Sequence, residues 1–169
     1  MIIYQLRSHR SFISYIDRTR EYYAAQGYSK PYMWPHYDDT PFTPLRKPLT
    51  ECHVGLVTTA GLPKPPGAVA AMFVPKELYV EQANPPPQRL FTDDLGWDKK
   101  ATHTEDVDSF MPINRLGEYV TSRRIGSASP RFYGVPTDYS QSRTLEHYAP
   151  QILEWCREDR LEAVLLSAL

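Results

Sequence analysis

Proline is the residue that most restricts how this chain can fold. The sequence of 169 residues contains 16 Pro and only 8 Gly. Proline fixes φ and lacks the backbone N–H that helix interiors and inner strands need. Most of the prolines lie in two segments, residues 28–50 and 62–108. We therefore predict an extended Pro-rich and aromatic arm over 28–50, which needs another surface to lie on, and a long irregular loop over 62–108, a feature that is often functional.

The other segments carry the patterns of helices and buried strands. The spacing of apolar residues predicts helices over 11–26, 112–124 and 144–158. Residues 52–59 and 162–169 are short apolar runs, typical of strands that are covered on both faces of a parallel sheet. A helix followed directly by an apolar strand is the second half of a βαβ unit. The sequence thus predicts an α/β fold, with a mostly parallel sheet flanked by helices.

Length, charge and cysteine content limit the class of protein. A chain of this length favours one domain, so we expect residues 1–169 to form a single α/β domain or half-domain. A net charge of −1 argues against a generic nucleic-acid surface. No secretory signal is evident, and no apolar run approaches the ~20 residues that span a bilayer. With two cysteines too far apart for a disulfide framework, we expect a cytoplasmic protein without membrane or nucleic-acid partners.

The first predicted strand ends in residues that suit ligand binding. Ligands of open α/β sheets bind beyond the carboxyl ends of the strands, where Thr58, Thr59 and Gly61 stand in this sequence. Backbone N–H groups in such a turn cradle an anion, and hydroxyl groups add hydrogen bonds. We predict that these three residues bind substrate. The alternative is an ordinary turn from strand to loop.

An imidazole and three carboxylates gather at His103, Glu105, Asp106 and Asp108. Loop side chains this close serve as general acid and base, which makes His103, Asp106 and Asp108 candidate catalytic residues. Imidazole and carboxylate also suit zinc, iron or manganese, for which His103, Glu105 and Asp108 are the candidate ligands. Their spacing matches no standard metal motif, so we expect neither a metal nor another cofactor. The alternative is an acidic loop that caps the helix at Pro112.

Three segments carry a family resemblance. They are Pro44–Gly61, with the sequence PLRKPLTECHVGLVTTAG, His103–Leu116, which ends in FMPINRL, and Arg124–Gly134, with the sequence RIGSASPRFYG. Together with the helix and strand over 144–169, they resemble the selenoprotein B family of glycine, sarcosine, betaine and D-proline reductases. The resemblance implies reductive C–N cleavage of an amino-acid-type substrate.

The family's catalytic motif has no counterpart in this sequence. In the reductases, the strand that resembles Ala163–Ser167 leads directly into selenocysteine-Gly-Thr-Cys, and neither Cys52 nor Cys156 stands at that place. The resemblance therefore implies an oxidoreductase subunit that is not active alone. It contributes half of a small-molecule substrate site, and a partner chain supplies the Cys/Sec motif. Two alternatives remain: a non-catalytic binding or scaffold protein with a vestigial site, and a metal-dependent hydrolase or lyase that uses His103 and the nearby acids.

Arginine side chains are candidates for holding a substrate carboxylate, because the guanidinium binds carboxylates with two parallel hydrogen bonds. The sequence offers Arg115, Arg124 and Arg131. Arg115 is favoured because it lies in a segment that resembles the family, and it is therefore predicted to bind substrate. The alternative for Arg115 is an ion pair with Asp108.

The strand at 162–169 also predicts a protein partner. Inner strands need neighbours on both edges, and two predicted strands are fewer than an α/β sheet usually has. An uncovered apolar edge is a liability that proteins normally remove. We therefore expect the isolated chain to be oligomeric or aggregation-prone, with a second protein subunit that continues the sheet.

Overall fold

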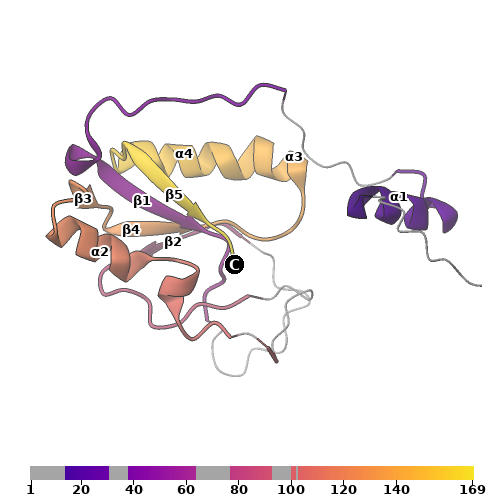
Figure 1. Cartoon of the computed structure of the whole chain (residues 1–169), viewed down its shortest axis with the longest axis horizontal. Helices are drawn as coiled ribbons and strands as arrows, with labels where there is room; N and C mark the ends of the chain where they lie inside the picture. Colours follow the sequence, from indigo (N-terminus) through magenta and orange to yellow (C-terminus); the bar gives the residue numbers. More distant parts are fainter. Residues whose placement is uncertain (1–13, 31–37, 64–76, 93–99, 102) are drawn as a thin grey trace, which may run out of the picture. The chain divides into compact units, whose positions relative to one another are not determined.

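The chain divides into two compact units, Met1–Pro41 and Phe42–Leu169. The first contains helix α1 and the second contains the whole sheet (Figure 1). The sequence predicts one domain over 1–169, and the α/β part of that prediction lies within the second unit. The computed structural model describes residues 14–30, 38–63, 77–92, 100–101 and 103–169.

The first unit contains one helix, α1 (Tyr15–Ala25), where the sequence predicts a helix over 11–26. Ser14 caps its amino end, because the serine side chain accepts a hydrogen bond of 3.2 Å from the Asp17 N–H. Gly27 follows its carboxyl end with a φ of 87°, a left-handed conformation that glycine adopts without strain. The residues of the prediction before Ser14 lie outside the described part of the chain.

The described part of the Pro-rich arm agrees with the prediction of an irregular segment. Residues 38–48 contain no helix or strand and are mostly exposed, and a 3₁₀ turn, η1 (Leu49–Glu51), follows them. Residues 31–37 of the arm lie outside the described residues. Lys47 near the end of the arm forms an ion pair of 2.7 Å with Glu162, which fixes this end beside the sheet.

The sheet is built around β1, and all but one of its pairings are parallel. Strand β5 pairs with β1 along one edge, while β3 and β4 pair with its other edge. Strand β2 pairs antiparallel with β4. This arrangement confirms the predicted α/β fold with a mostly parallel sheet. The strands are β1 (His53–Thr58), β2 (Tyr79–Gln82), β3 (Ser127–Ala128), β4 (Arg131–Gly134) and β5 (Ala163–Ser167).

Helices cover both faces of the sheet (Figure 1). A 3₁₀ turn, η2, precedes α2 on one face, and a continuous helical segment lies on the other. None of the helices within the described ranges is both long and apolar enough to cross a bilayer. The elements are η2 (Val107–Ser109), α2 (Ile113–Thr121), α3 (Gln141–Arg143), the π-helical turn η3 (Thr144–Tyr148) and α4 (Ala149–Glu158).

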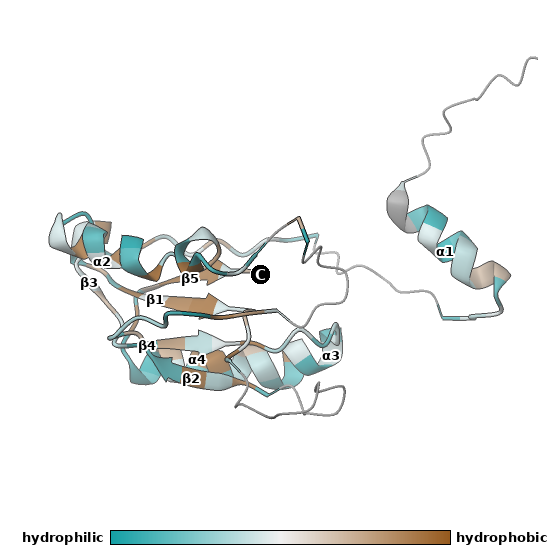
Figure 2. Ribbon diagram, turned by 90° about the horizontal axis from the view of Figure 1, so that it is seen from below, coloured by the Kyte–Doolittle hydropathy of each residue, from teal (hydrophilic) through white to brown (hydrophobic). Residues whose placement is uncertain are grey.

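Strand β1 is buried on both faces, as its uninterrupted apolar sequence predicts. Val54 and Leu56 belong to the buried cluster that includes residues of α2, whereas Val57 packs with Cys156 of α4. Figure 2 shows hydrophobic residues along both β1 and β5. Cys52 and Cys156 are buried free thiols, which agrees with their interpretation as packing residues.

Three short strands differ from the sequence prediction. β2 lies inside the loop expected to be irregular over 62–108, and β3 and β4 precede the predicted helix over 144–158. Each has four residues or fewer, so local periodicity is too short to reveal it, and pairing with distant residues holds it in place. Residues 64–76, 93–99 and 102 of the loop lie outside the described residues.

Candidate functional site

The carboxyl ends of β1 and β4 lie side by side, and the chain leaves them toward opposite faces of the sheet. The connection from β1 to β3 contains α2, and the connection from β4 to β5 contains α4 (Figure 1). Such a divergence marks the place where open α/β sheets bind ligands. The candidate site therefore consists of residues 58–61 after β1, 135–140 after β4, and 167–169 at the end of β5.

The turn after β1 uses its polar groups within the chain. The buried Thr58 hydroxyl accepts a hydrogen bond of 3.1 Å from the Ala60 N–H. The Gly61 N–H donates to the Phe91 carbonyl at 2.6 Å, and the Phe91 N–H donates back to Gly61 at 3.0 Å. In the turn predicted to cradle an anion, the N–H groups of Ala60 and Gly61 thus already donate hydrogen bonds to other groups of the chain. Substrate binding by Thr58 and Gly61 stays a prediction.

Thr59 joins this turn to the end of β5. Its N–H donates to the Ser167 carbonyl at 3.2 Å. Its hydroxyl accepts a hydrogen bond of 2.9 Å from the Leu169 N–H and donates to the Leu169 carbonyl at 3.3 Å. Leu169, just beyond β5, therefore lies against the turn predicted to bind substrate. The Thr59 hydroxyl joins the two segments.

Tyr79 of β2 also contacts this turn, and sequence reasoning missed it. Its hydroxyl donates to the Ala60 carbonyl at 2.6 Å. Its ring lies against Gly134, where an added Cβ would come within 1.8 Å of the ring. Burial raises the pKa of Tyr79, so its phenol stays a hydrogen-bond donor. The only sequence signal was a short tyrosine-containing run inside the proline-rich loop.

Asp138 organises the loop after β4. It accepts hydrogen bonds from the Ser140 N–H at 3.0 Å, the Arg143 guanidinium at 3.0 Å and the Tyr148 hydroxyl at 2.7 Å. Burial disfavours its charge, but these hydrogen bonds outweigh burial and lower the pKa of Asp138. Arg143 and Tyr148 also line an open groove of about 780 Å³, together with Trp155. Asp138 therefore fixes both the loop and one wall of this groove.

The acidic cluster forms two caps. Asp106 accepts a hydrogen bond of 3.1 Å from the Asp108 N–H and so caps η2. Asp108 accepts from the Asn114 N–H at 2.9 Å and from its side-chain amide at 3.0 Å, at the start of α2. His103 accepts a hydrogen bond of 3.4 Å from the Glu105 N–H. Within the described ranges, no three His, Cys, Asp or Glu side chains are grouped to hold a metal.

Capping of the following helix is the alternative to a catalytic or metal-binding role that the sequence analysis gives for this cluster. A substitution at Asp108 tests it. Asp108→Ala is expected to lower the free energy of unfolding by about 1 kcal/mol, as loss of a cap does. Asp108→Asn keeps an oxygen acceptor and is expected to retain most of the stability. Urea denaturation of both variants checks this. Equal stability of Asp108→Ala and the native chain would contradict the cap. Catalysis by His103, Asp106 and Asp108 stays a prediction.

Arg115 pairs with acidic side chains of its own chain. Its guanidinium lies 2.8 Å from Glu118 and 3.6 Å from Asp108, and the arginine side chain is 59% exposed. The pairing with Asp108 is the alternative that the sequence left open. Arg124 lies over the ring of Tyr119 at 4.4 Å. Substrate binding by Arg115 stays a prediction.

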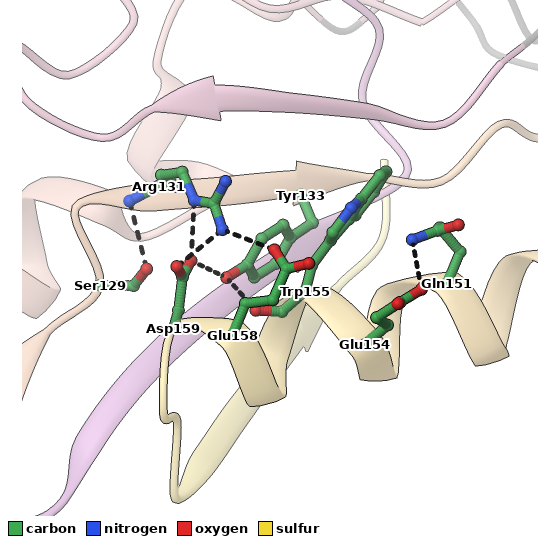
Figure 3. Close-up of polar contacts among 8 residues, drawn as sticks. All are labelled: Ser129, Arg131, Tyr133, Gln151, Glu154, Trp155, Glu158 and Asp159. Carbon is green, nitrogen blue, oxygen red and sulfur yellow. Dashed lines mark hydrogen bonds and ion pairs between the residues drawn. The ribbon is translucent and has the colours of Figure 1, made fainter.

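Arg131 does hold a carboxylate, but it is that of Asp159. Two hydrogen bonds of 2.9 and 2.7 Å join them, and the Tyr133 hydroxyl also donates to Asp159 (Figure 3). Glu158 lies 3.4 Å from the same guanidinium. The ring of Tyr133 stacks on Trp155, with centroids 6.0 Å apart. The cluster joins the end of α4 to β4, which gives Arg131 a structural partner within the chain. Substrate binding by Arg131 stays a prediction.

The carboxyl edge around Thr59 is therefore the candidate site that the topology of the sheet defines. β1 and β5 meet there, and the loop after β4 lies at the same edge. Tyr79 contacts this edge through the Ala60 carbonyl. Comparisons with protein-family models, curated proteins and solved structures find no match for this chain.

Proposed function

We propose that this chain is one subunit of a two-component enzyme resembling the selenoprotein B-type reductases. It contributes the carboxyl edge of β1, β4 and β5 to a site for a small, amino-acid-like substrate. A partner chain supplies the Cys/Sec motif, so the subunit is not active alone. The family resemblance implies reductive C–N cleavage as the reaction. Two buried free thiols agree with a reducing compartment such as the cytoplasm.

The contact between Thr59 and Leu169 carries this proposal. In the reductases, the redox motif follows directly on the strand that resembles β5. In this chain, the Thr59 hydroxyl binds the backbone of Leu169 just beyond that strand. A redox motif brought to this position by a partner would face the turn at Thr58–Gly61. The geometry thus supports a substrate site completed by a second chain.

Titration of the full chain with glycine, sarcosine, betaine and D-proline tests the proposal. We expect backbone amide shifts confined to residues 58–61, 135–140 and 167–169 in NMR spectra. Thr59→Val keeps the side-chain shape but removes the hydroxyl, and is expected to weaken binding by roughly tenfold, the value of about one hydrogen bond. Thr121→Val is the matched control, because the Thr121 hydroxyl bonds only within α2 in the described contacts, to Gly117 at 3.0 Å.

Two results would contradict the proposal. One is the absence of shifts with every ligand at millimolar concentration. The other is a set of shifts elsewhere, such as in the groove lined by Arg143 and Trp155.

A scaffold protein with a vestigial site is the second candidate. The observation that favours it is the internal use of the turn's polar groups, since the N–H groups of Thr59, Ala60 and Gly61 all bond within the chain. In that case Thr59→Val changes stability alone, and none of the four ligands moves an amide signal of the candidate site.

A further inference from the structure

Strand β5 carries an apolar edge that no strand among the described residues covers. β5 pairs with β1 along one side only. Val164, Leu165 and Leu166 are 37%, 44% and 75% exposed. Strands of parallel sheets are usually buried on both faces, and an open apolar edge promotes pairing with another strand. This edge is therefore a candidate interaction surface.

The direction of the backbone N–H and C=O groups of β5 decides which of them are available to pair with a further strand. The Thr59 N–H donates to the Ser167 carbonyl, so Ser167 directs its backbone groups toward β1. These groups alternate in direction along a strand. The N–H and C=O groups of Val164 and Leu166 therefore point away from β1, and each residue offers one donor and one acceptor to a further strand.

The exposed side chains lie on both faces of the sheet. Leu165 pairs with Leu56, whose side chain packs with the α2 cluster, and Leu166 pairs with Val57, whose side chain packs with α4. Residues paired across a parallel ladder share a face. A helix laid on one face would leave the other uncovered. A strand that continues the sheet, with its own covering layers, fits both faces.

We propose that β5 pairs antiparallel with β5 of a second copy of this chain, about a two-fold axis at Leu165. This arrangement places Val164 opposite Leu166 of the partner subunit, so that the outward N–H and C=O groups of each residue bond to the other. The pairing joins two sheets into one. It goes beyond the proposed function, which brings a different chain to the carboxyl end of β5, and it makes a second copy of this chain the subunit that continues the sheet.

The sequence of β5 favours a second copy because it is complementary to itself. No charged residue stands between Ala163 and Leu169. In this register, Glu162 meets Ala168 of the partner subunit, and Glu162 is already held by Lys47 at 2.7 Å. Leu165 meets its own equivalent at a non-hydrogen-bonded position, where side chains approach most closely. No like charges oppose one another, and the two-fold contact is isologous.

Sedimentation of the full chain over the micromolar range tests the pairing. We expect a reversible dimer. Leu166→Lys places a charge at the edge and is expected to raise the dissociation constant at least about tenfold. Val164→Pro removes an outward N–H without touching the ladder to β1, and is expected to give a folded monomer. Leu153→Lys makes the same charge change on α4, at a residue that is 49% exposed, and is expected to leave the dimer intact.

A cysteine variant tests the register. Leu165→Cys is expected to form an intermolecular disulfide on mild oxidation, since the two native cysteines are buried. Leu145→Cys, at an exposed position of η3, is expected not to do so. A wild-type chain that stays monomeric at micromolar concentration overturns the proposal, as does a dimer that Leu166→Lys and Val164→Pro leave unchanged. Neither result alters the ligand titration, so this proposal and the proposed function fail separately.

Discussion

Replacing Asp159 by alanine is expected to lower the free energy of unfolding by about 3 kcal/mol. The carboxylate binds the Arg131 guanidinium through two hydrogen bonds, and it accepts another from Tyr133, which is fully buried. Its removal leaves the buried Tyr133 hydroxyl without its carboxylate acceptor, and it leaves the partly buried Arg131 guanidinium with the longer contact to Glu158. Hydrogen bonds to charged groups contribute about 1.5–3 kcal/mol each. Urea denaturation at neutral pH measures the loss.

Glu158→Ala is the matched control for this substitution. Glu158 is the next residue along α4 and lies 3.4 Å from the same guanidinium, but its side chain is 55% exposed. Exposed ion pairs contribute at most about 1 kcal/mol, so the control is expected to change stability little. Equal losses for Asp159→Ala and Glu158→Ala would contradict the assignment of Asp159 as the residue that joins α4 to β4.

The same carboxylate predicts how the loss depends on pH. Hydrogen bonds from Arg131, opposed by burial, hold the pKa of Asp159 below its ordinary value of 3.8. A carboxyl group whose pKa is lower in the folded state contributes its full stability above the unfolded pKa, and loses it as pH falls through the folded pKa. The stability difference between the native chain and Asp159→Ala is therefore expected to stay constant from neutral pH to about pH 5 and to narrow below about pH 4. A difference that is independent of pH would contradict this linkage.

Gly126→Ala is the second substitution with a large expected effect, a loss of about 3 kcal/mol. A Cβ at Gly126 would lie 2.6 Å from the carbonyl carbon of Glu51 and 2.9 Å from the Cys52 nitrogen. Both are backbone atoms directly before β1, and the Cys52 carbonyl accepts a hydrogen bond from the first residue of β3, so they move only if the pairing of β1 with β3 is disturbed. The Gly126 N–H also donates to the Leu49 carbonyl at 3.2 Å, which holds the two segments together.

Gly117→Ala provides the comparison for Gly126→Ala. Gly117 lies within α2, and an added Cβ there meets no atom within 4 Å. Alanine in a helix interior is more stable than glycine by about 0.5–1 kcal/mol, so this variant is expected to gain stability. Thermal denaturation of both variants checks the pair. A Gly126→Ala variant as stable as the native chain would show that the backbone at Glu51 and Cys52 is not closely packed against this position.

The sequence predicts the two longest strands of the sheet from their apolar composition, but the predicted burial on both faces holds for β1 and not for β5, where Val164, Leu165 and Leu166 are exposed. β1 reads as a continuous apolar run, and so does β5. β4 could not be predicted in the same way. It has four residues, of which Phe132 and Tyr133 are fully buried, and Pro130 and Pro136 stand on either side of it. Its stability comes from pairing with β1 and β2, which local patterns do not contain.

The sequence predicts only the part of the candidate site that follows from where a buried strand ends. The sequence pattern marks the end of a buried parallel strand, where ligands of open α/β sheets bind, and so predicts Thr58 and Thr59 as site residues. The bonds that occupy those groups come from Leu169 and other distant residues, so the sequence could not reveal them. Arg131 shows the same limit, because its partner Asp159 is 28 residues away and meets it only in the folded chain.

The central place of β1 in the sheet has a consequence for how the protein folds during its synthesis. β1 is synthesised first, yet its neighbours on both sides, β3, β4 and β5, all follow it, and its longest pairing joins Val54 to Ala163. Contacts between residues so far apart form slowly, because a long loop must close first. On the ribosome, the edge of β1 that pairs with β5 therefore stays unpaired while more than half of the chain is translated. Holding chaperones are expected to engage this segment during synthesis and to release it once β5 emerges.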